Sequence, residues 1–145
     1  MPKGTFNVLP GDLEAGAGLA EHLGAAKVTL IGSVSAGRAV MRSASATGKP
    51  VLLELGGKNA FIAYPDSDPA KVADAIVAGM NFGWCGQSCG STSRAFLHDD
   101  LYDAVVDRLP NAVARYRPGL PTDPATTMGA LVSREHFARV MSYVD

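Results

Sequence analysis

Both cysteines of the chain lie in one short segment, residues 84–94, with the sequence WCGQSCGSTSR. Cys85 and Cys89 are four residues apart and have mostly small residues around them. Two thiols at this spacing could form a redox or disulfide pair, supply part of a metal site, or provide one nucleophile with an unreactive neighbour. The rest of the chain must decide among these three kinds of chemistry.

Cys89 is the better candidate for a nucleophile. A free cysteine thiol is only about 3% ionised at pH 7, so a nucleophilic cysteine needs help from a base, a helix N-terminus or a dipole. Ser88 and Gly90 leave the backbone of Cys89 accessible, whereas Cys85 follows the only tryptophan and is typical of a packed side chain. On this local chemistry alone, a buried and unreactive Cys89 remains an open alternative.

The two other readings of the cysteines have weaker support. A zinc site would use Cys85, Cys89 and His98, but it lacks a fourth ligand, and the cysteine spacing is not that of a zinc knuckle. A disulfide between Cys85 and Cys89 would need an oxidising compartment, and two cysteines in 145 residues are too few for a disulfide-stabilised scaffold. A thiol redox function stays open as a minor alternative.

Glu54 is the second residue with a chemical role to consider. It lies in VLLELGGK, residues 51–58, among apolar neighbours and just before paired glycines. A poorly solvated carboxylate can take and release a proton near neutral pH, and glycines allow a ligand or another backbone to approach. The alternative is an exposed glutamate at the end of a strand.

The segment IGSVSAG, residues 31–37, has the pattern of a turn from a strand into a helix. A helix N-terminus presents unpaired N–H groups and the positive end of the helix dipole, which together favour a phosphate. Gly32 allows close approach, Ser33 adds a hydroxyl, and Gly37 permits tight packing of the helix. This turn is neither a dinucleotide-binding fingerprint nor a P-loop, so by itself it is more typical of an ordinary capped helix.

The turn at residues 31–37 and Glu54 lie in a first part of the chain that alternates between predicted strands and helices. Asp12 is predicted to cap a helix, and the later helix should turn Val40, Met41 and Ala44 inward. The alternation and the continuous apolar strands predict an α/β fold with a parallel sheet. The predicted strands cover residues 5–12, 26–32 and 50–57, and the predicted helices cover 13–23 and 35–46.

The pattern restarts after Gly57. Asp68 or Ser67 should cap the first helix, with Pro69 in its first turn, and its apolar side should include Val72, Ala75, Ile76 and Met80. Pro110 should bend or end the next helix. The predicted strands cover 59–65 and 93–99, the predicted helices cover 67–84, 100–116 and 133–144, and residues 117–129 form an irregular connection.

Composition excludes several classes of protein. Hydrophobic residues make up 47% and charged residues 19%, as in globular proteins, and the net charge of −1 gives no reason to expect nucleic-acid or membrane binding. The sequence shows neither a signal peptide nor an apolar run long enough to span a membrane. We therefore expect a cytoplasmic protein.

Five segments together resemble the NAD(P)-dependent aldehyde dehydrogenases, in the order found in that family. They are PKGTFNVLPGD, IGSVSAGR, LELGGK, GQSCGSTSR and MGALVS. The pair LELGGK and GQSC, with Glu54 and Cys89 35 residues apart, carries most of the specificity. The resemblance covers essentially the whole chain, whereas members of the family are several times longer.

The resemblance implies a role for each candidate residue. Cys89 would be the nucleophile and Glu54 the general base. Gly32, Ser33 and Gly37 would belong to the turn that contacts the pyrophosphate of NAD or NADP, and Leu55 would lie near the nicotinamide. Ser88 and Gly90 would border the substrate tunnel, and Arg94 would help to hold the cysteine loop.

The resemblance also implies a mechanism and a set of partners. The Cys89 thiolate would attack an aldehyde, hydride transfer to the coenzyme would leave a thioester, and Glu54 would activate the water that releases the carboxylic acid. The oxyanion would be held by the Cys89 N–H and an asparagine. The substrate would be a small-molecule aldehyde, and full-length members form homodimers or homotetramers.

The sequence departs from the family pattern in several places. Ile31 replaces a usual threonine, and GDL replaces GDG after the first predicted strand. The oxyanion asparagine, the lysine that binds the adenosine ribose and a glutamate that binds the nicotinamide ribose fall outside these 145 residues. We therefore expect a fragment that is inactive alone, with a non-catalytic fragment or a redox module using Cys85 and Cys89 as alternatives.

The resemblance also predicts the domain organisation. Residues 1–53 would form the last part of a Rossmann-like coenzyme domain, and residues 54–145 the first part of an α/β catalytic domain. The predicted hinge is ELGGK, residues 54–58.

Overall fold

A computed structural model describes residues 1–144, which form two compact units. Unit 1 covers residues 1–56 and unit 2 begins at Gly57. The division falls inside the predicted hinge segment and three residues after the predicted domain boundary, because β2 continues through Leu55. The predicted α/β class is confirmed.

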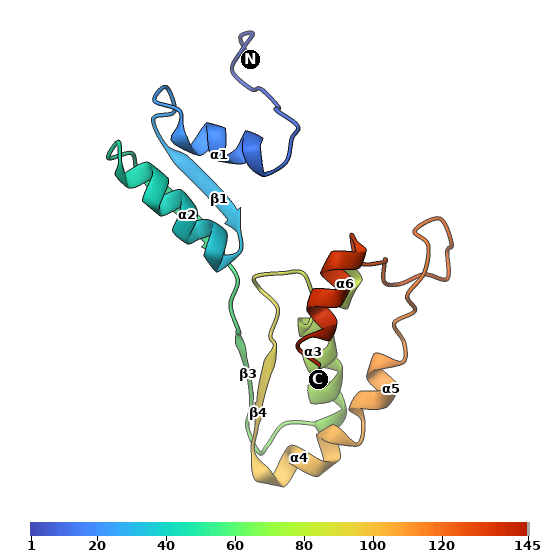
Figure 1. Cartoon of the computed structure of the whole chain (residues 1–145). Helices are drawn as coiled ribbons and strands as arrows, with labels where there is room; N and C mark the ends of the chain where they lie inside the picture. The colour runs from blue at the N-terminus through green and yellow to red at the C-terminus, as the bar shows by residue number, and fades with distance from the viewer. Residues whose placement is uncertain (145) are drawn as a thin grey trace. The chain divides into compact units, whose positions relative to one another are not determined.

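Unit 1 is a two-stranded parallel sheet with two helices (Figure 1). Its elements are α1 (Leu13–Glu21), β1 (Val28–Gly32), α2 (Val34–Ser45) and β2 (Val51–Leu55). The register pairs Val28 with Val51 and Gly32 with Leu55. The helix α2 packs on both strands and on α1. The alternation predicted from sequence is therefore confirmed for these four elements.

Local interactions explain where the helices of unit 1 begin and end. The Asp12 carboxylate accepts a hydrogen bond from the Glu14 N–H at 3.2 Å, which confirms the predicted cap. At the other end of α1, the Lys49 ammonium donates to the carbonyl oxygens of Ala20 and His22 at 2.9 and 2.8 Å. A cation at a helix C-terminus satisfies free carbonyls and complements the helix dipole.

Two predictions for unit 1 are wrong. Residues 5–12 form no strand, because no strand within residues 1–144 pairs with this segment, and its Phe6, Val8 and Leu9 are exposed. Met41 also faces solvent, although Ala44 is buried as predicted. The spacing of apolar residues predicts only approximately which side of a helix is buried when few other elements pack against that helix.

Unit 2 contains a second parallel pair of strands with its helices (Figure 1). Its register pairs Ala60 with Arg94 and Ala63 with Leu97. A proline-containing connection, held by a bridge between Pro118 and Met128, precedes the last helix. The elements are β3 (Ala60–Ala63), α3 (Pro69–Gly79), the 3₁₀ helix η1 (Phe82–Trp84), β4 (Arg94–Leu97), α4 (Asp99–Val106), α5 (Leu109–Val113) and α6 (Arg134–Met141).

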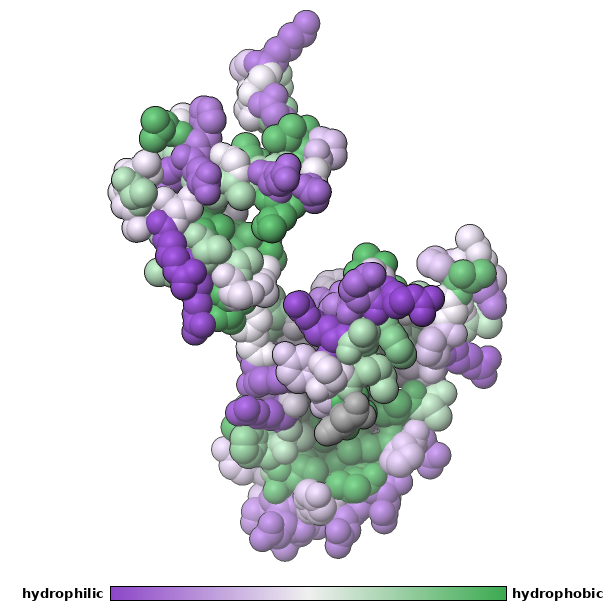
Figure 2. Space-filling view, viewed as in Figure 1, coloured by the Kyte–Doolittle hydropathy of each residue, from purple (hydrophilic) through white to green (hydrophobic). Residues whose placement is uncertain are grey.

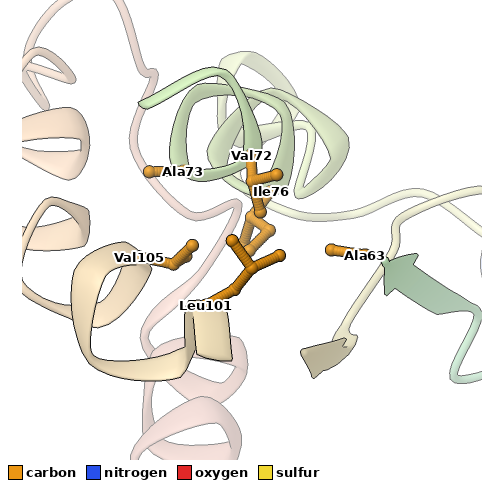
Figure 3. Packing of buried hydrophobic residues seen from close by; sticks show 6 residues of the cluster. All are labelled: Ala63, Val72, Ala73, Ile76, Leu101 and Val105. Atoms are coloured by element: carbon orange, nitrogen blue, oxygen red, sulfur yellow. The ribbon is translucent and has the colours of Figure 1, made fainter. Parts of the chain in front are cut away.

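The core of unit 2 lies where α3 and α4 pack against β3. In Figure 3 the side chains of these elements point toward one another. Val105 is fully buried, and Phe61, Leu97 and Leu109 pack against the cluster. Ala75, predicted to face inward, is exposed, whereas Ala73 is buried. The members of the cluster are Ala63, Val72, Ala73, Ile76, Leu101 and Val105.

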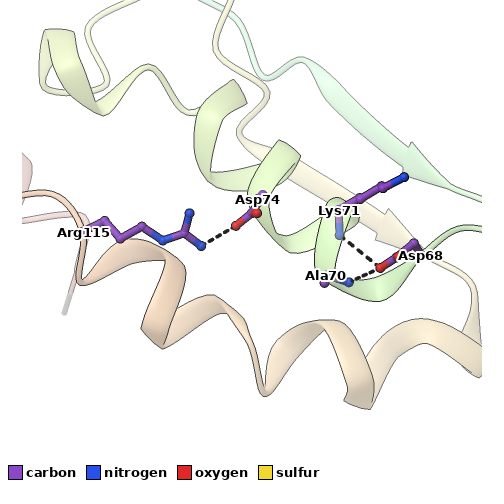
Figure 4. A network of polar contacts seen from close by, with 5 residues as sticks. All are labelled: Asp68, Ala70, Lys71, Asp74 and Arg115. Carbon is purple, nitrogen blue, oxygen red and sulfur yellow. Dashed lines mark hydrogen bonds and ion pairs between the residues drawn. The ribbon is translucent and has the colours of Figure 1, made fainter.

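Polar contacts cap the start of α3 and link the middle of α3 to Arg115, just after α5 (Figure 4). The Asp68 carboxylate accepts from the N–H groups of Ala70 at 2.8 Å and Lys71 at 3.3 Å, and these bonds hold its pKa below the ordinary value. Arg115 forms an ion pair with Asp74 beside a cavity of about 380 Å³. Pro110 lies in the first turn of α5, so α4 and α5 are separate helices, as its position predicted.

Each sheet has one face that its own unit leaves uncovered. On β1 and β2 the exposed residues include Ile31 and Leu52; on β3 and β4 the cross-strand partners Ile62 and Phe96 are 63% and 57% exposed. Apolar side chains accordingly reach the surface of both units (Figure 2). Within residues 1–144, no helix combines the length and the hydropathy that crossing a membrane requires.

Candidate active site

The cysteine segment forms a loop between the end of α3 and the start of β4. Asn81 and Cys85, on either side of η1, both have φ of 55°, in the left-handed region. The Asn81 carbonyl accepts from the N–H groups of Trp84 at 2.9 Å and Gly86 at 3.1 Å, which closes this turn. The predicted helix at 67–84 therefore ends early, and the chain reverses direction before the second cysteine.

Cys89 is exposed within a tight turn. The Ser91 N–H donates to the Ser88 carbonyl at 3.1 Å, and the Gly90 N–H donates to the Ser88 hydroxyl at 3.2 Å. The small neighbours thus leave the thiol accessible, as the sequence predicted. An exposed thiol on an ordered turn is available to attack a small electrophile.

The residues after Cys89 are anchored to the end of α3. The Thr92 N–H donates to the Gly79 carbonyl at 2.9 Å, and the Ser91 hydroxyl donates to the Met80 carbonyl at 3.1 Å. The Asn81 amide also donates to the Ser91 hydroxyl, at 3.3 Å. A methyl group at Gly79 would overlap the Thr92 hydroxyl, so the loop approaches α3 too closely for a larger residue.

Asn59 makes a further contact with the loop that the sequence analysis missed. Its side-chain amide donates to the carbonyl oxygens of Cys89 at 2.6 Å and Ser91 at 3.1 Å. Asn59 directly follows LELGGK, but these partners are 30 and 32 residues further along the chain. Only the position of an asparagine immediately before a predicted strand could have drawn attention to it.

Cys85 is held differently from Cys89. Its half-buried thiol donates a hydrogen bond to the Gly129 carbonyl at 3.1 Å, which joins the cysteine loop to the MGALVS segment. Both cysteines are free thiols. Across residues 1–144, no three or more His, Cys, Asp or Glu side chains are placed to hold a metal ion. The geometry therefore gives the two cysteines unequal surroundings.

The backbone of Arg94 contacts Asn59 rather than the cysteine loop. It is the first residue of β4, and its N–H donates to the Asn59 carbonyl at 3.3 Å. Its side chain is exposed, and within residues 1–144 the guanidinium makes no hydrogen bond or ion pair. A role for this side chain in holding the loop stays a prediction.

Glu54 lies near the carboxyl end of β2, opposite Ile31 in the register. The expectation that its apolar neighbours in sequence shield it is wrong for unit 1 by itself, because Glu54 is exposed. Alternate residues of a strand point to opposite faces, so Leu53 and Leu55 face α2 while Glu54 lies on the uncovered face. Its carboxylate is therefore accessible to water, from which it could accept a proton.

The predicted phosphate turn has the expected local structure. Gly32 ends β1, and the Ser33 hydroxyl caps α2 by accepting from the Ala36 N–H at 3.1 Å. The cap also hydrogen bonds to the Ser35 hydroxyl at 2.9 Å. The first N–H groups of a helix have no partner within it, so this end of a 12-residue helix offers donors to an anion.

Gly37 has a packing role that its position in the sequence predicted. A Cβ atom there would lie 2.9 Å from Cδ2 and 3.0 Å from Cδ1 of Leu55. The absence of a side chain thus lets α2 lie directly on β2. The side chain of Leu55 is half-buried in this contact.

An apolar cavity of about 230 Å³ lies between α1 and α2 in unit 1. It runs along the same helix whose N-terminus carries the Ser33 cap. Its walls combine small residues and a few larger aliphatic ones with the polar residues Glu21 and Ser43. The lining includes Leu13, Ala17, Ala20, Leu30, Ala36 and Val40.

Comparison with known proteins identifies the relatives of this chain. The profile of the "Aldehyde dehydrogenase family" matches residues 1–145. The chain belongs to the aldehyde dehydrogenase family. It is 51% identical to "Aldehyde dehydrogenase tropH" of Talaromyces stipitatus, with 99% of this chain and 28% of that protein covered. It is 39% identical to "Betaine aldehyde dehydrogenase" of Brucella anthropi, with 100% of this chain and 30% of that protein covered.

Solved aldehyde dehydrogenases share the fold. A gamma-glutamyl-gamma-aminobutyraldehyde dehydrogenase from Burkholderia cenocepacia matches with a TM-score of 0.93 and 36% identity, covering 99% of this chain and 29% of that chain. An NAD⁺ complex of an aldehyde dehydrogenase from Bacillus cereus matches with a TM-score of 0.83 and 35% identity, covering 90% of this chain and 26% of that one. This aldehyde dehydrogenase chain thus spans 28–30% of the length of the curated relatives named above.

Proposed function

We propose that this chain carries the nucleophile and part of the coenzyme site of an enzyme that oxidises an aldehyde to a carboxylic acid with NAD⁺ or NADP⁺. The observation that carries the proposal is the exposed Cys89 thiol on a loop fixed to α3 and to Asn59, in a member of the aldehyde dehydrogenase family. Glu54, in LELGGK, is the proposed general base.

The first half of the proposed reaction makes a covalent bond to Cys89. The thiolate sulfur attacks the aldehyde carbon, and the carbonyl oxygen becomes an oxyanion that accepts a hydrogen bond from the Cys89 N–H. The oxidised nicotinamide, when bound, accepts the hydride that leaves this carbon. Loss of the hydride converts the adduct on Cys89 into a thioester.

The second half restores the thiolate. Glu54 takes a proton from a water molecule, and the water oxygen attacks the thioester carbon. The carbon–sulfur bond breaks and the carboxylic acid leaves. Splitting the oxidation into two steps in this way is the advantage of covalent catalysis.

Unit 1 supplies part of the coenzyme site in this proposal. The N-terminus of α2 at Gly32 and Ser33 would bind the pyrophosphate through free N–H groups, and Gly37 keeps α2 close to β2. The largely apolar cavity between α1 and α2 would take the adenine ring. The residues present therefore suit a dinucleotide.

Full activity is expected to need more polypeptide than these 145 residues. The chain spans 28–30% of its curated relatives, and the family resemblance assigns the oxyanion asparagine and the ribose-binding residues to other segments. We therefore expect the purified chain to form little or no NADH from an aldehyde. Robust aldehyde-dependent NADH formation by the purified chain would show that this expectation is wrong.

A hybrid enzyme tests the proposed function. Residues 1–145 would replace the matching segment of the betaine aldehyde dehydrogenase from Brucella anthropi, and aldehyde-dependent reduction of NAD⁺ and NADP⁺ would be measured. We expect activity that Cys89→Ala abolishes and Glu54→Gln strongly reduces, since each change removes the reacting group. Cys85→Ala is the matched control and should leave most of the activity.

Two outcomes would contradict the proposal. One is a folded hybrid with no aldehyde oxidation, and the other is activity that survives Cys89→Ala. A thiol redox function would instead require both cysteines. Equal losses of activity in Cys85→Ala and Cys89→Ala, measured under oxidising assay conditions, would favour that alternative. The Cys85–Gly129 hydrogen bond argues for unequal roles.

A further inference from the structure

Asn59 contacts both the β3–β4 strand pair, through its backbone, and the cysteine loop, through its side chain. Its carbonyl oxygen accepts from the Arg94 N–H at 3.3 Å, one residue before the β3–β4 register begins at Ala60. The backbone of Asn59 is thereby tied to the sheet. Its side chain extends from this fixed point to the loop.

Both hydrogens of the Asn59 amide are used on that loop. The nitrogen Nδ2 carries two hydrogens and donates to the carbonyl oxygens of Cys89 and Ser91, at 2.6 and 3.1 Å. Within residues 1–144, no other donor reaches either carbonyl. A single side chain therefore sets the direction of two carbonyl groups on the turn that carries the thiol.

Two other anchors of the loop act beyond the nucleophile, whereas the bonds from the Ser91 and Gly90 N–H groups to Ser88 are internal to the turn. The bonds from Thr92 to Gly79 and from Ser91 to Met80 hold the segment that returns to β4. The Cys89 thiol makes no hydrogen bond within residues 1–144 and is exposed, so packing does not place it. Cys89 is followed by Gly90, whose backbone is intrinsically free. The bond from Asn59 is thus the tie at Cys89 itself.

We propose that Asn59 is a positioning residue, which holds the Cys89 peptide through its two amide hydrogen bonds and thereby orients the thiol for attack. The inference rests on the proposed function and extends it to a residue outside the reacting groups. Asn59 takes no proton and touches no substrate in this proposal. Its effect comes from fixing ψ of Cys89, and small displacements of a reacting group are costly in rate.

Hydrogen exchange in the 145-residue chain tests the structural step without any catalysis. Asn59→Ala removes both donors, and Asn59→Asp keeps the size of the side chain but turns an acceptor toward two carbonyls. Both variants should speed exchange in peptides covering residues 86–93 several-fold, while exchange in α3 stays unchanged. Asn111→Ala is the matched control, because Asn111 is exposed on α5. Unchanged exchange over 86–93 in both Asn59 variants would overturn the proposal.

Kinetics in the hybrid enzyme test the positioning step. Asn59→Ala and Asn59→Asp should lower kcat by about tenfold to a hundredfold, with little change in the KM for coenzyme or in Tm. Asn111→Ala should leave kcat unchanged. A wild-type kcat in Asn59→Asp would overturn the proposal. A fall in kcat accompanied by a comparable fall in Tm would also overturn it, because the loss would then come from general destabilisation. If the unmodified hybrid is inactive, the proposed function fails, and the exchange experiment still decides whether Asn59 holds the loop.

Discussion

Cys85 and Cys89 show how two identical side chains acquire different properties over four residues. The Cys89 thiol is exposed on the Ser88–Ser91 turn, whereas the Cys85 thiol is half-buried and donates to the Gly129 carbonyl. A thiol that is already hydrogen bonded and partly covered must break that contact before it reacts. The local backbone, rather than the residue type, therefore makes Cys89 the more accessible of the two thiols.

Alkylation kinetics provide a direct comparison of the two thiols. In the folded chain, iodoacetamide should modify Cys89 several-fold faster than Cys85, as measured by mass spectrometry of the two peptides. In concentrated urea the two rates should converge, because the difference comes from the folded loop. Equal rates in the native chain would contradict the structural distinction, and Cys85→Ser serves as a control that leaves the Cys89 rate unchanged.

The sequence indicated features that depend on local neighbours and did not predict the contacts between distant residues. The small neighbours of Cys89 favoured an accessible thiol, and Asp68, one of the two predicted caps, lies just before Pro69 and caps α3. The contact between Asn59 and Cys89 depends on the parallel pairing of β3 and β4, which brings together residues 30 positions apart. A pattern of residue types contains no such pairing.

At the scale of elements, the predicted strands formed where another strand within residues 1–144 pairs with them. The strands β1 and β2 pair with each other, and their positions were close to those predicted. The strand predicted at residues 5–12 has no neighbouring strand within residues 1–144, and the segment adopts no regular structure. A strand is stabilised by cross-strand hydrogen bonds and side-chain pairs, so its sequence alone does not determine it.

The contact of α2 with β2 depends on a glycine. Gly37→Ala should destabilise unit 1 by about 1–3 kcal/mol, because the new methyl group would press on the Leu55 side chain at 2.9–3.0 Å. Gly16→Ala on α1 is the matched control: nothing lies within 4 Å of the added Cβ. It should stabilise the helix by about 0.5–1 kcal/mol. Urea unfolding followed by circular dichroism would measure both, and a stabilising Gly37→Ala would contradict the close packing.

The start of α3 should respond to acid through Asp68. Its folded pKa is lowered by the N–H groups of Ala70 and Lys71, so its contribution to stability is present above pH 3.8 and is lost as pH falls through the lower folded value. Asp68→Asn keeps a capping oxygen that does not titrate, whereas Asp68→Ala removes the cap at every pH. After correction for intrinsic exchange rates, lowering the pH from neutral to below 4 should therefore speed amide exchange in α3 of the wild type. The same change in pH should speed exchange less in Asp68→Asn. An identical pH dependence in both would contradict this.

At the scale of the molecule, the two units differ in how much apolar surface they bury. Within residues 1–144, eight of the ten buried hydrophobic residues belong to unit 2, and unit 1 contributes only Ala20 and Ala44. A unit of 56 residues is marginal even with a good core. Parallel sheets are ordinarily covered on both faces, yet Ile31 and Leu52 on one sheet and Ile62 and Phe96 on the other remain exposed. Unit 1 is therefore the less stable part.

Hydrogen exchange should reveal this difference in the purified chain. Amides of β1 and β2 should exchange faster than those of α3 and α4, because opening unit 1 exposes little apolar surface. Leu101→Ala, which empties part of the unit 2 core, should lower the free energy of opening that amide exchange reports for α3 and α4 by about 2–5 kcal/mol. Val106→Ala on the exposed side of α4 is the control and should have a small effect. Protection of β1 and β2 equal to that of α3 would mean that unit 1 is stabilised by interactions other than its buried residues.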